Sequence, residues 1–568
     1  MGFETMKEKC LKRLFYSLIS QSWRCGFGFL SLGFLLMGRL SSNASQNVNA
    51  NVCVYGGTDG GVMAAVQAAR MGKTVALIVV GSHLGGVTSS GLGETDIGHF
   101  GDGYIQGEAR EFYTRVGQKY GITGAKFTFE PHVAEAVFDE MAQQAGVNIY
   151  TNQHLTSVAM KGQQIVALTM NNGNIIHAKM FIDASNEGDL MAKAGVSYTI
   201  GREAISQYGE SYNGIRKPNT GGHQFGIYKI NPYLNPTDST NGLLPFIQTN
   251  ATGTIGARDK RIQAYTYRMC LTQTATNKLP ITARTNYDPS QYELLARYIH
   301  AMVTHGVSPS LKNFMTISSM PNGKTDINNN GPVSTDFIGQ NCNYSEANYT
   351  TRMQICQAHR NYIQGLFYFL ATDPRVPSNV RSQMQSYGLC KDEFVDNGGW
   401  PYQLYVREAR RMISDYVMTQ SNCLGQVTIT DSVGLAAYTM DSHNCQRVVS
   451  NGYVQNEGDV ERKIPRPYPI SYRSIVPKTG QCANLIVPWC LSASHIAFGS
   501  IRMEPVFMIL GQSAGTAACL AIDEGVAVQN VSVPKLHAQL TSDKQLLYWR
   551  GSVARGLISN DVNATEKQ

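Results

Sequence analysis

A glycine-rich turn between a short apolar strand and a helix constrains the fold of this chain more than any other feature. The turn lies in residues 51–61, which read Asn-Val-Cys-Val-Tyr-Gly-Gly-Thr-Asp-Gly-Gly. Valine and tyrosine favour a strand before the turn, the alanine-rich run 62–70 favours a helix after it, and a second apolar strand follows at 74–80. The N-terminus of such a helix offers free N–H groups to an anion, so the unit predicts a dinucleotide pyrophosphate bound in an α/β domain.

The turn departs from the usual dinucleotide pattern at two places. In the spacing Gly-x-Gly-x-x-Gly, the first and third positions are Gly56 and Gly61, but the middle position is Thr58. The carboxylate that usually ends the second strand and binds the ribose is replaced by Val79. We predict that Gly56, Gly57, Thr58, Gly60 and Gly61 bind the cofactor; the alternative is a glycine-rich turn in an ordinary α/β domain.

Length and charge narrow the class of protein. A chain of 568 residues exceeds the size at which one core keeps growing, which predicts two domains. The formal net charge is +7, and residues 1–44 hold six lysines and arginines against two glutamates, which leaves +3 for the rest. Such a small excess, without a basic stripe, does not predict a nucleic-acid partner.

The first 44 residues predict export. Residues 26–38 form an apolar run of 13 residues behind a basic lead, which is short for a membrane span and typical of a secretory signal. We therefore expect a periplasmic or secreted protein with no stable membrane span in the mature chain; a membrane-anchored form is the alternative. The ten later cysteines contain no Cys-x-x-Cys pair, so no metal site is predicted and most are expected to be core residues.

Two further stretches are expected to return to the nucleotide. Residues 81–99 hold six glycines, and we predict a loop that covers the cofactor with Gly85, Gly86 and Thr88; a flexible surface loop is the alternative. Helices are expected at 108–120 and 131–145, followed by a three-stranded meander over 155–181. The last of these strands leads to Asp183 and Ala184, which we place at the cofactor.

The second half of the chain begins as aromatic, loop-rich sequence and ends in a small-residue helix. Residues 201–472 lack the βαβ rhythm and predict a substrate domain inserted into the nucleotide-binding one. Within it, 402–419 predicts an amphipathic helix with Arg407, Arg410 and Arg411 on its wet side. A strand at 484–488 then leads into a helix over 506–523, whose N-terminus is suited to stabilising charge on a reduced flavin. Gly511 and Gly515 are its predicted cofactor residues.

Several segments together resemble the FAD-dependent oxidoreductase family of secreted bacterial flavoproteins, within the glutathione-reductase-like group. The likeness covers nearly the whole chain after residue 50, and its most specific segments are 56–61, 82–86, 129–133, 181–189, 440–444 and 494–505. In this family a threonine at the place of Thr58 is ordinary, whereas relatives usually carry glutamate where this chain has Val79. The resemblance implies FAD as the cofactor.

The resemblance also implies the domain plan. The fold class is α/β, with a Rossmann-like FAD-binding domain that has a parallel sheet and a β-meander, plus an inserted α+β substrate domain. The expected parts are a signal peptide or anchor (1–44), the FAD-binding domain in two pieces (45–200 and 475–535), the inserted domain (201–474) and a C-terminal tail (536–568).

Hydride transfer to flavin N5 requires a group that takes the accompanying proton, and histidine suits that role near neutral pH. We predict His443 and His495 as catalytic, with a purely structural histidine as the alternative for each. Arg502 is predicted to hold an anionic substrate or the reduced flavin, with Glu504 as its ion-pair partner. Weaker substrate candidates are Tyr267, Arg268, Asp326 and Asn328, followed by His99 and His223.

These residues predict an FAD-dependent oxidoreductase acting on a small polar molecule, for which a sugar is plausible. No second strand-turn-helix fingerprint for a nicotinamide cofactor is found, so oxygen, a quinone or a small carrier is the expected electron acceptor. Two alternatives remain open: a flavin-assisted eliminase acting on a polysaccharide, and a secreted binding protein that keeps the fold without turnover.

Overall fold

The computed structural model describes residues 45–250 and 252–551. The predicted signal or anchor segment and the end of the predicted tail lie outside these residues. From residue 47 onward the chain forms one compact unit, so the predicted boundaries of the inserted domain stay a prediction.

The glycine-rich turn leaves the middle strand of a seven-stranded mixed sheet. The strand order is β3(Asn148–Tyr150), β2(Val75–Ile78), β1(Asn47–Tyr55), β6(Ile175–Asp183), β5(Gln164–Met170) and β4(Leu155–Lys161), and β22(Leu485–Ile486) pairs with β6. β1 runs parallel to both β2 and β6, with Val52 opposite Val75 on one side and Met180 on the other. A strand paired on both edges and covered on both faces must be apolar, and Val52 to Tyr55 are buried.

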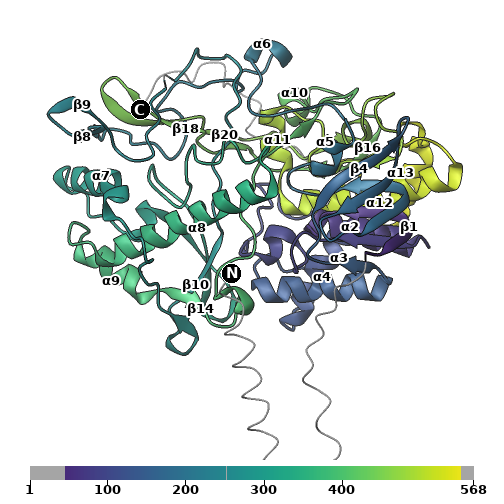
Figure 1. Ribbon diagram of the computed structural model, residues 1–568, viewed down its shortest axis with the longest axis horizontal. Helices are drawn as coiled ribbons and strands as arrows, with labels where there is room; N and C mark the ends of the chain where they lie inside the picture. The colour runs from purple at the N-terminus through teal and green to yellow at the C-terminus, as the bar shows by residue number, and fades with distance from the viewer. Residues whose placement is uncertain (1–44, 251, 552–568) are drawn as a thin grey trace, which may run out of the picture. The chain divides into compact units, whose positions relative to one another are not determined.

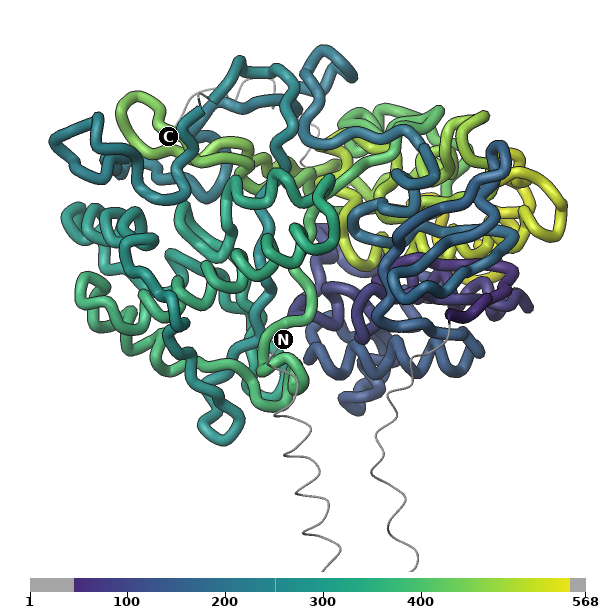
Figure 2. Tube along the Cα trace, viewed as in Figure 1, coloured from purple at the N-terminus to yellow at the C-terminus, as the bar shows by residue number. Residues whose placement is uncertain are grey.

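Helices from the two ends of the described chain lie side by side next to this sheet. The purple α2(Asp59–Arg70) packs along the yellow α12(Glu504–Glu524) (Figures 1 and 2). The contact needs small residues, because a Cβ on Gly511 would overlap the carbonyl oxygen of Gly60, and one on Gly515 would lie 2.6 Å from that of Ala64. Burial of the valine and methionine side chains of α2 contributes about 1.5–3 kcal/mol each to this core.

The other elements of this half follow the sequence prediction closely. The predicted meander is confirmed as β4, β5 and β6, which pair antiparallel in succession. The two predicted helices are confirmed as α3(Gly107–Lys119) and α4(Pro131–Ala145), and α12 confirms the predicted C-terminal helix. The remaining helices here are α5(Asp189–Lys193), α11(His495–Ile501) and α13(Val533–Ser542).

The middle of the chain builds a second sheet that is antiparallel. Its order is β11(Lys278–Leu279), β14(Gly388–Cys390), β10(Met269–Thr272), β13(Lys324–Asn329) and β12(Met315–Ser319). The helices of this part are α6(Ile205–Tyr208), α7(Glu293–Thr304), α8(Tyr349–Thr372), α9(Ser378–Ser386) and α10(Gln420–Cys423). The described residues between 201 and 472 form no βαβ unit, which agrees with the sequence pattern.

Short two-stranded sheets complete the described chain. They pair β8(Tyr233–Asn235) with β9(Asp238–Leu243), β15(Arg411–Met412) with β7(Tyr198–Thr199), β16(Ser432–Ala436) with β21(Tyr468–Ser471), β17(Met440–Ser442) with β20(Val460–Arg462), and β18(Gln446–Ser450) with β19(Tyr453–Glu457). Among the described residues, α12 alone has the length and apolarity of a membrane span, and 89% of its apolar window is buried inside the protein.

The predicted amphipathic helix at 402–419 is wrong. The segment is extended, and its only regular element is the two-residue strand β15. The three arginines do not face solvent: Arg407, Arg410 and Arg411 are buried, and each binds a carboxylate. Helical spacing of apolar residues misled the prediction because a fully buried segment also carries apolar residues at every third or fourth place.

Candidate functional site

A cavity of about 920 Å³ runs along the glycine-rich turn. Four of the predicted cofactor residues line it: Gly56, Gly57, Thr58 and Gly86. Residues 81–83, in the loop predicted to cover the cofactor, also line this cavity. The cavity thus extends from the carboxyl end of β1 and β2, where parallel sheets bind their ligands, towards the middle part of the chain.

Thr58 at the middle position of the turn has a structural explanation. It caps α2, because its Oγ1 accepts a hydrogen bond from the backbone N–H of Gly61 at 3.1 Å. The same hydroxyl donates to the carbonyl of Ala184 at 2.8 Å, which ties the turn to the end of β6. Gly57 lies against Val79, where a Cβ would come within 2.6 Å of the valine side chain.

The other predicted cofactor residues support the cavity from behind. Thr88 Oγ1 donates to Asp59 Oδ2 at 3.0 Å, and Asp183 accepts from the backbone N–H of Met191 at 2.7 Å. Burial raises the pKa of Asp183 to about 6. Eight predicted cofactor residues do not line the main cavity: Gly60, Gly61, Gly85, Thr88, Asp183, Ala184, Gly511 and Gly515. Their assignment as direct cofactor ligands therefore stays a prediction.

A narrow cavity continues from the turn to the N-terminus of α12. Asp59, Tyr405 and Glu504 line it together with Thr58 and Gly86. Glu504 is 2% exposed, and its Oε2 has no hydrogen-bond partner within the described residues.

Arg502 joins this narrow cavity to a buried charged cluster. Its guanidinium donates to Tyr405 Oη at 3.2 Å and to Asp441 Oδ2 at 2.6 Å. The predicted ion pair between Arg502 and Glu504 is wrong, because Asp441 on β17 takes the guanidinium. The Nε of Arg502 is buried without a partner in the described part of the chain, which leaves a donor for a bound group.

His443 lies next in this cluster, between two carboxylates. Its Nδ1 is 2.8 Å from Asp336 Oδ2, and its Nε2 is 3.5 Å from Asp441 Oδ2. Burial and the Arg407 guanidinium lower the pKa of His443, but the two carboxylates raise it further, so the pKa lies above its ordinary value of 6.5. The side chain of His443 is 11% exposed and that of Asp441 is 22% exposed, so both are partly accessible to solvent.

Two further ion pairs complete the cluster. Arg407 binds Asp336 at 2.8 Å, and this guanidinium with His443 overcomes burial to hold the pKa of Asp336 at about 2. Arg268 binds Asp326 at 2.5 Å, as strands β10 and β13 bring the two together. Asp96 faces Arg268, and burial raises the pKa of this carboxyl.

The remaining substrate candidates are dispersed around the two cavities. Tyr267 lines the main cavity, and Asn328 Oδ1 lies 3.4 Å from Arg407. His223 stacks on His443 with ring centroids 6.3 Å apart, whereas His99 is exposed. Of these four, only His223 contacts a predicted catalytic residue.

His495 lies in a different, fully buried arrangement. Its Nδ1 is 2.8 Å from Glu408 Oε2, and its Nε2 is 3.0 Å from Ser442 Oγ. The three side chains are at most 1% exposed, and Glu408 also binds the buried Arg411. The order serine, histidine, carboxylate is that of a hydrolase triad, but all three side chains are buried and the Ser442 hydroxyl also donates to the carbonyl of Gly458. We interpret this arrangement as structural support beneath the charged cluster.

Sequence reasoning missed several members of the cluster. Asp336, Tyr405, Arg407 and Asp441 were not predicted as site residues, although Asp441 stands within the segment that resembles the family. Asp336 follows no motif, and Arg407 was assigned to the solvent face of a helix that does not form. The only usable signal was the position of Asp441 two residues before His443.

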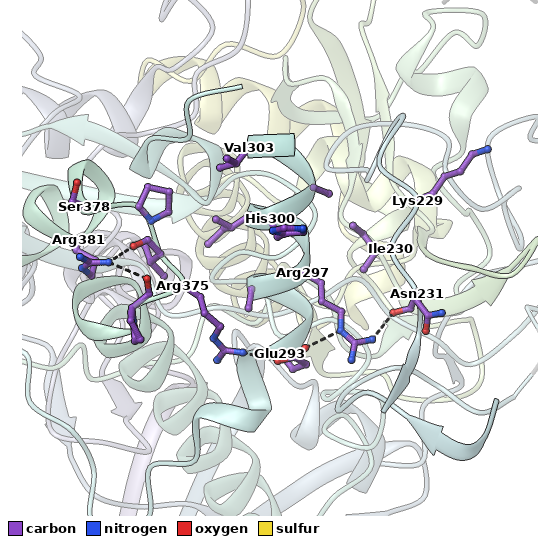
Figure 3. A pocket seen from close by; sticks show the side chains of 16 residues that line it. Lys229, Ile230, Asn231, Glu293, Arg297, His300, Val303, Arg375, Ser378 and Arg381 are labelled. Atoms are coloured by element: carbon purple, nitrogen blue, oxygen red, sulfur yellow. Dashed lines mark hydrogen bonds and ion pairs between the residues drawn. The ribbon is translucent and has the colours of Figure 1, made fainter. Parts of the chain in front are cut away.

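In two other features of the described chain, the charged side chains are already paired with groups of the protein. A cavity of about 680 Å³ lies beside α7. Figure 3 shows its lining, in which Arg297 and Arg381 donate to backbone carbonyls and Arg375 binds Glu293. Glu130, His132 and Glu393 converge like metal ligands, but Lys324 Nζ occupies the place, at 2.7 Å from Glu130 and 2.6 Å from Glu393.

Comparison with known proteins places this geometry in a family. Residues 51–540 match the family described as FAD dependent oxidoreductase. The solved L-amino acid deaminase from Proteus vulgaris is 16% identical over 28% of this chain and 53% of its own length, with a TM-score of 0.24, so the match spans about half of that enzyme. THI4 from Thermovibrio ammonificans is 16% identical over 36% of this chain and 75% of its own, with a TM-score of 0.22. No curated protein matches at a significant level.

FAD is the cofactor of this family, and the observed site fits it at all but one point. The glycines at 56, 57 and 86 let backbone form the cavity wall, and Thr58, the N-cap of α2, lines the same cavity, so the N-terminal end of this helix lies beside it. Arg502 Nε, a donor, and Glu504 Oε2, an acceptor, are buried without a partner among the described residues, so both are available to a bound group. The misfit is Val79, which lines the cavity where a carboxylate would hold ribose hydroxyls.

Proposed function

The chain belongs to the FAD-dependent oxidoreductase family, and from this premise we propose that it oxidises a C–H bond of a small polar substrate beside the charged cluster. FAD, when bound, supplies the two-electron acceptor, which takes a hydride at N5. The observation that carries the proposal is His443, a partly exposed imidazole fixed by Asp336 and facing Asp441, which Arg502 links to Tyr405 in the wall of the narrow cavity.

His443 is the proposed proton acceptor. Asp336 binds Nδ1 and fixes the ring, which leaves Nε2 on the side of Asp441. The imidazole takes the hydroxyl proton of the substrate as the C–H bond breaks, so it must be neutral before the reaction. Because the pKa of His443 is raised, turnover is expected to increase with pH until this group has lost its proton.

Arg502 and Asp441 are the proposed positioning pair for the substrate. The guanidinium keeps one donor atom free, while the carboxylate accepts hydrogen bonds from hydroxyl groups. A hydroxylated molecule matches these two partners, which supports a sugar as the substrate class. The absence of a second nucleotide fingerprint favours oxygen, a quinone or a small carrier as the electron acceptor.

The test is the absorbance of the flavin under anaerobic conditions. Purified protein is mixed with a panel of sugars and organic acids, and bleaching near 450 nm at a rate that rises with pH supports the proposal. A protein that binds FAD but is bleached by none of the hydroxylated compounds contradicts it.

The flavin-assisted eliminase is distinguished by its product balance. It would cleave a polysaccharide with the flavin cycling back, so that no oxidised product accumulates. A secreted binding protein would take up a sugar without any change in flavin absorbance. The feature that favours the oxidase over the binding protein is His443, which Asp336 fixes as a proton acceptor.

We also propose that the protein is exported, on the basis of residues 1–44. The test is fractionation of cells that express the full chain; a product of unchanged mass in the cytoplasm contradicts export.

A further inference from the structure

Two buried carboxyl groups lie where the cofactor cavity meets α12. Asp59 is the first residue of α2, and Glu504 is the first residue of α12. Both line the same narrow cavity beside the glycine-rich turn, and they are 3% and 2% exposed. No ion pair to either carboxyl exists within residues 45–250 and 252–551. Two such groups in one water-poor place cannot both stay charged at low cost.

The hydrogen bonds of the two carboxyl groups show which oxygen atom has no partner. Asp59 Oδ1 accepts from the backbone N–H of Gly60 at 2.6 Å, and its Oδ2 accepts from Thr88 Oγ1 at 3.0 Å. Asp59 thereby occupies an N–H group of the helix end that faces the cavity. Glu504 Oε2 has no partner among the described atoms, although it is buried. A protonated carboxyl would turn that oxygen into a donor for a bound group.

The surroundings do not neutralise the pair. The charged and titratable groups that face it are Tyr113 on α3, Asp96 on the covering loop, Arg268 immediately before β10, Tyr405, Tyr104 and Arg502. The two cations among them are already matched by carboxylates, since Arg268 binds Asp326 and Arg502 binds Asp441. Asp96 adds a further negative charge to the same region.

We propose that FAD binds to this protein together with a proton on the Asp59–Glu504 carboxyl pair. The pyrophosphate of FAD carries negative charge, and the glycine-rich turn brings it to the helix end that Asp59 occupies. A charged pair repels this group, whereas a protonated carboxyl donates a hydrogen bond to it. The inference concerns the cofactor alone and does not depend on the proposed substrate.

The pKa values of the two groups place this effect in an accessible range. Burial raises the pKa of Asp59 to about 7, and burial together with Asp59 raises that of Glu504 to about 8. A group that gains a proton on binding favours binding at low pH and opposes it at high pH. The affinity for FAD is therefore expected to fall as the pH rises through and above these values.

The test is a count of the protons that accompany FAD. The full chain, freed of flavin by a chaotropic salt and refilled in a titration calorimeter, is measured at about pH 8.5 in two buffers of different ionisation enthalpy. The difference in heat gives the proton number, for which we expect about one per FAD at this pH and close to none at about pH 6. Holoprotein is measured in parallel, and the flavin released on dilution, followed by its fluorescence, increases with pH.

Variants assign the proton to the pair. Asp59→Asn is expected to flatten the pH dependence of FAD affinity, and the double change Asp59→Asn with Glu504→Gln is expected to abolish proton uptake. Glu140→Gln, which alters an exposed carboxyl on α4, is the matched control and should behave like the unchanged protein. If a variant does not fold, the wild-type proton number still decides the matter.

Three outcomes would overturn the inference. The first is wild-type protein that binds FAD without proton uptake at about pH 8.5. The second is uptake that persists in the folded double variant. The third is FAD affinity at high pH that is restored by Mg²⁺ and lost with a chelator, because a cation would then take the place of the proton.

Discussion

The two ends of the candidate site are built in different ways. At the glycine-lined end, consecutive backbone from 56 to 58 leaves one parallel strand and forms the cavity wall directly. At the charged end, His443, Asp336, Arg407 and Arg502 come from four separate segments and are held by ion pairs. The first end is suited to holding a large cofactor, and the second to moving a proton.

This difference separates binding from chemistry. Changes at the glycine-lined end should alter the content of FAD and the stability of the fold, whereas changes at the charged end should alter turnover while FAD stays bound. His495 lies beside the charged end and shows whether a carboxylate partner alone makes a histidine catalytic. Like His443 it binds a carboxylate, but it is buried.

The largest effect is expected from His443→Ala at the charged end. Loss of the proton acceptor should reduce the turnover of a bleaching substrate by about 100- to 10,000-fold. Steady-state kinetics measures the loss, and flavin absorbance should show unchanged FAD content. His305→Ala at the exposed end of α7 is the control. Full turnover by the variant would remove His443 from the chemistry.

Gly511→Ala should disrupt the packing of α12 against α2, the helix that follows the glycine-rich turn. The new Cβ would overlap the carbonyl oxygen of Gly60, which forces α2 and α12 apart and costs about 3 kcal/mol of the free energy of unfolding. Thermal unfolding and the flavin-to-protein absorbance ratio should both fall. Gly103→Ala serves for comparison, because its Cβ would meet nothing closer than 3.6 Å. Normal FAD content in the Gly511 variant would show that this helix contact does not shape the cofactor site.

His495→Ala should lower stability without removing the chemistry. Glu408 would lose a partner in a place where it is fully buried, and we expect a loss of about 2–3 kcal/mol in the free energy of unfolding. Denaturant titration measures this loss, and turnover per folded molecule should stay within about threefold of wild type. A loss as large as that of His443→Ala would instead place His495 in the reaction.

Val79→Glu should strengthen the glycine-lined end. A carboxylate beside the cavity would accept hydrogen bonds from the ribose, for a gain of about 1.4 kcal/mol or tenfold in FAD affinity. Equilibrium titration with FAD measures the change, and Val79→Gln separates charge from shape. Weaker binding by the glutamate variant would show that this chain holds the ribose in another way.

The smallest effect expected is a shift of the pH profile in Asp336→Asn. Asp336 raises the pKa of His443, so its neutralisation should move that pKa down. Since the neutral imidazole is the reactive form, the rise of kcat/KM with pH should then begin at lower pH than in the wild type. A profile that stays in place would mean that another group titrates.

The predictable part of the fold is the part with local signals. The glycine-rich turn, α3, α4, the meander and α12 each carry a pattern of strand formers, caps or small residues that their own sequence supplies. The failure at 402–419 arose where tertiary burial overrode such a pattern. Arg407, Arg410 and Arg411 look like a solvent face, yet each binds a carboxylate brought to it from elsewhere in the chain.

The candidate site also has one part that local sequence predicts and another that depends on tertiary contacts. The sequence by itself determined the glycine-lined end, because Gly56 to Gly61 are contiguous and their conformations depend on residue type. It also pointed to His443 and Arg502, without separating His443 from His495. Only the tertiary structure decided that Arg502 pairs with Asp441, that Asp336 faces His443 and that Asp59 and Glu504 line one cavity. These arrangements bring together residues from 61 to 445 positions apart, and no local rule of propensity reaches that far.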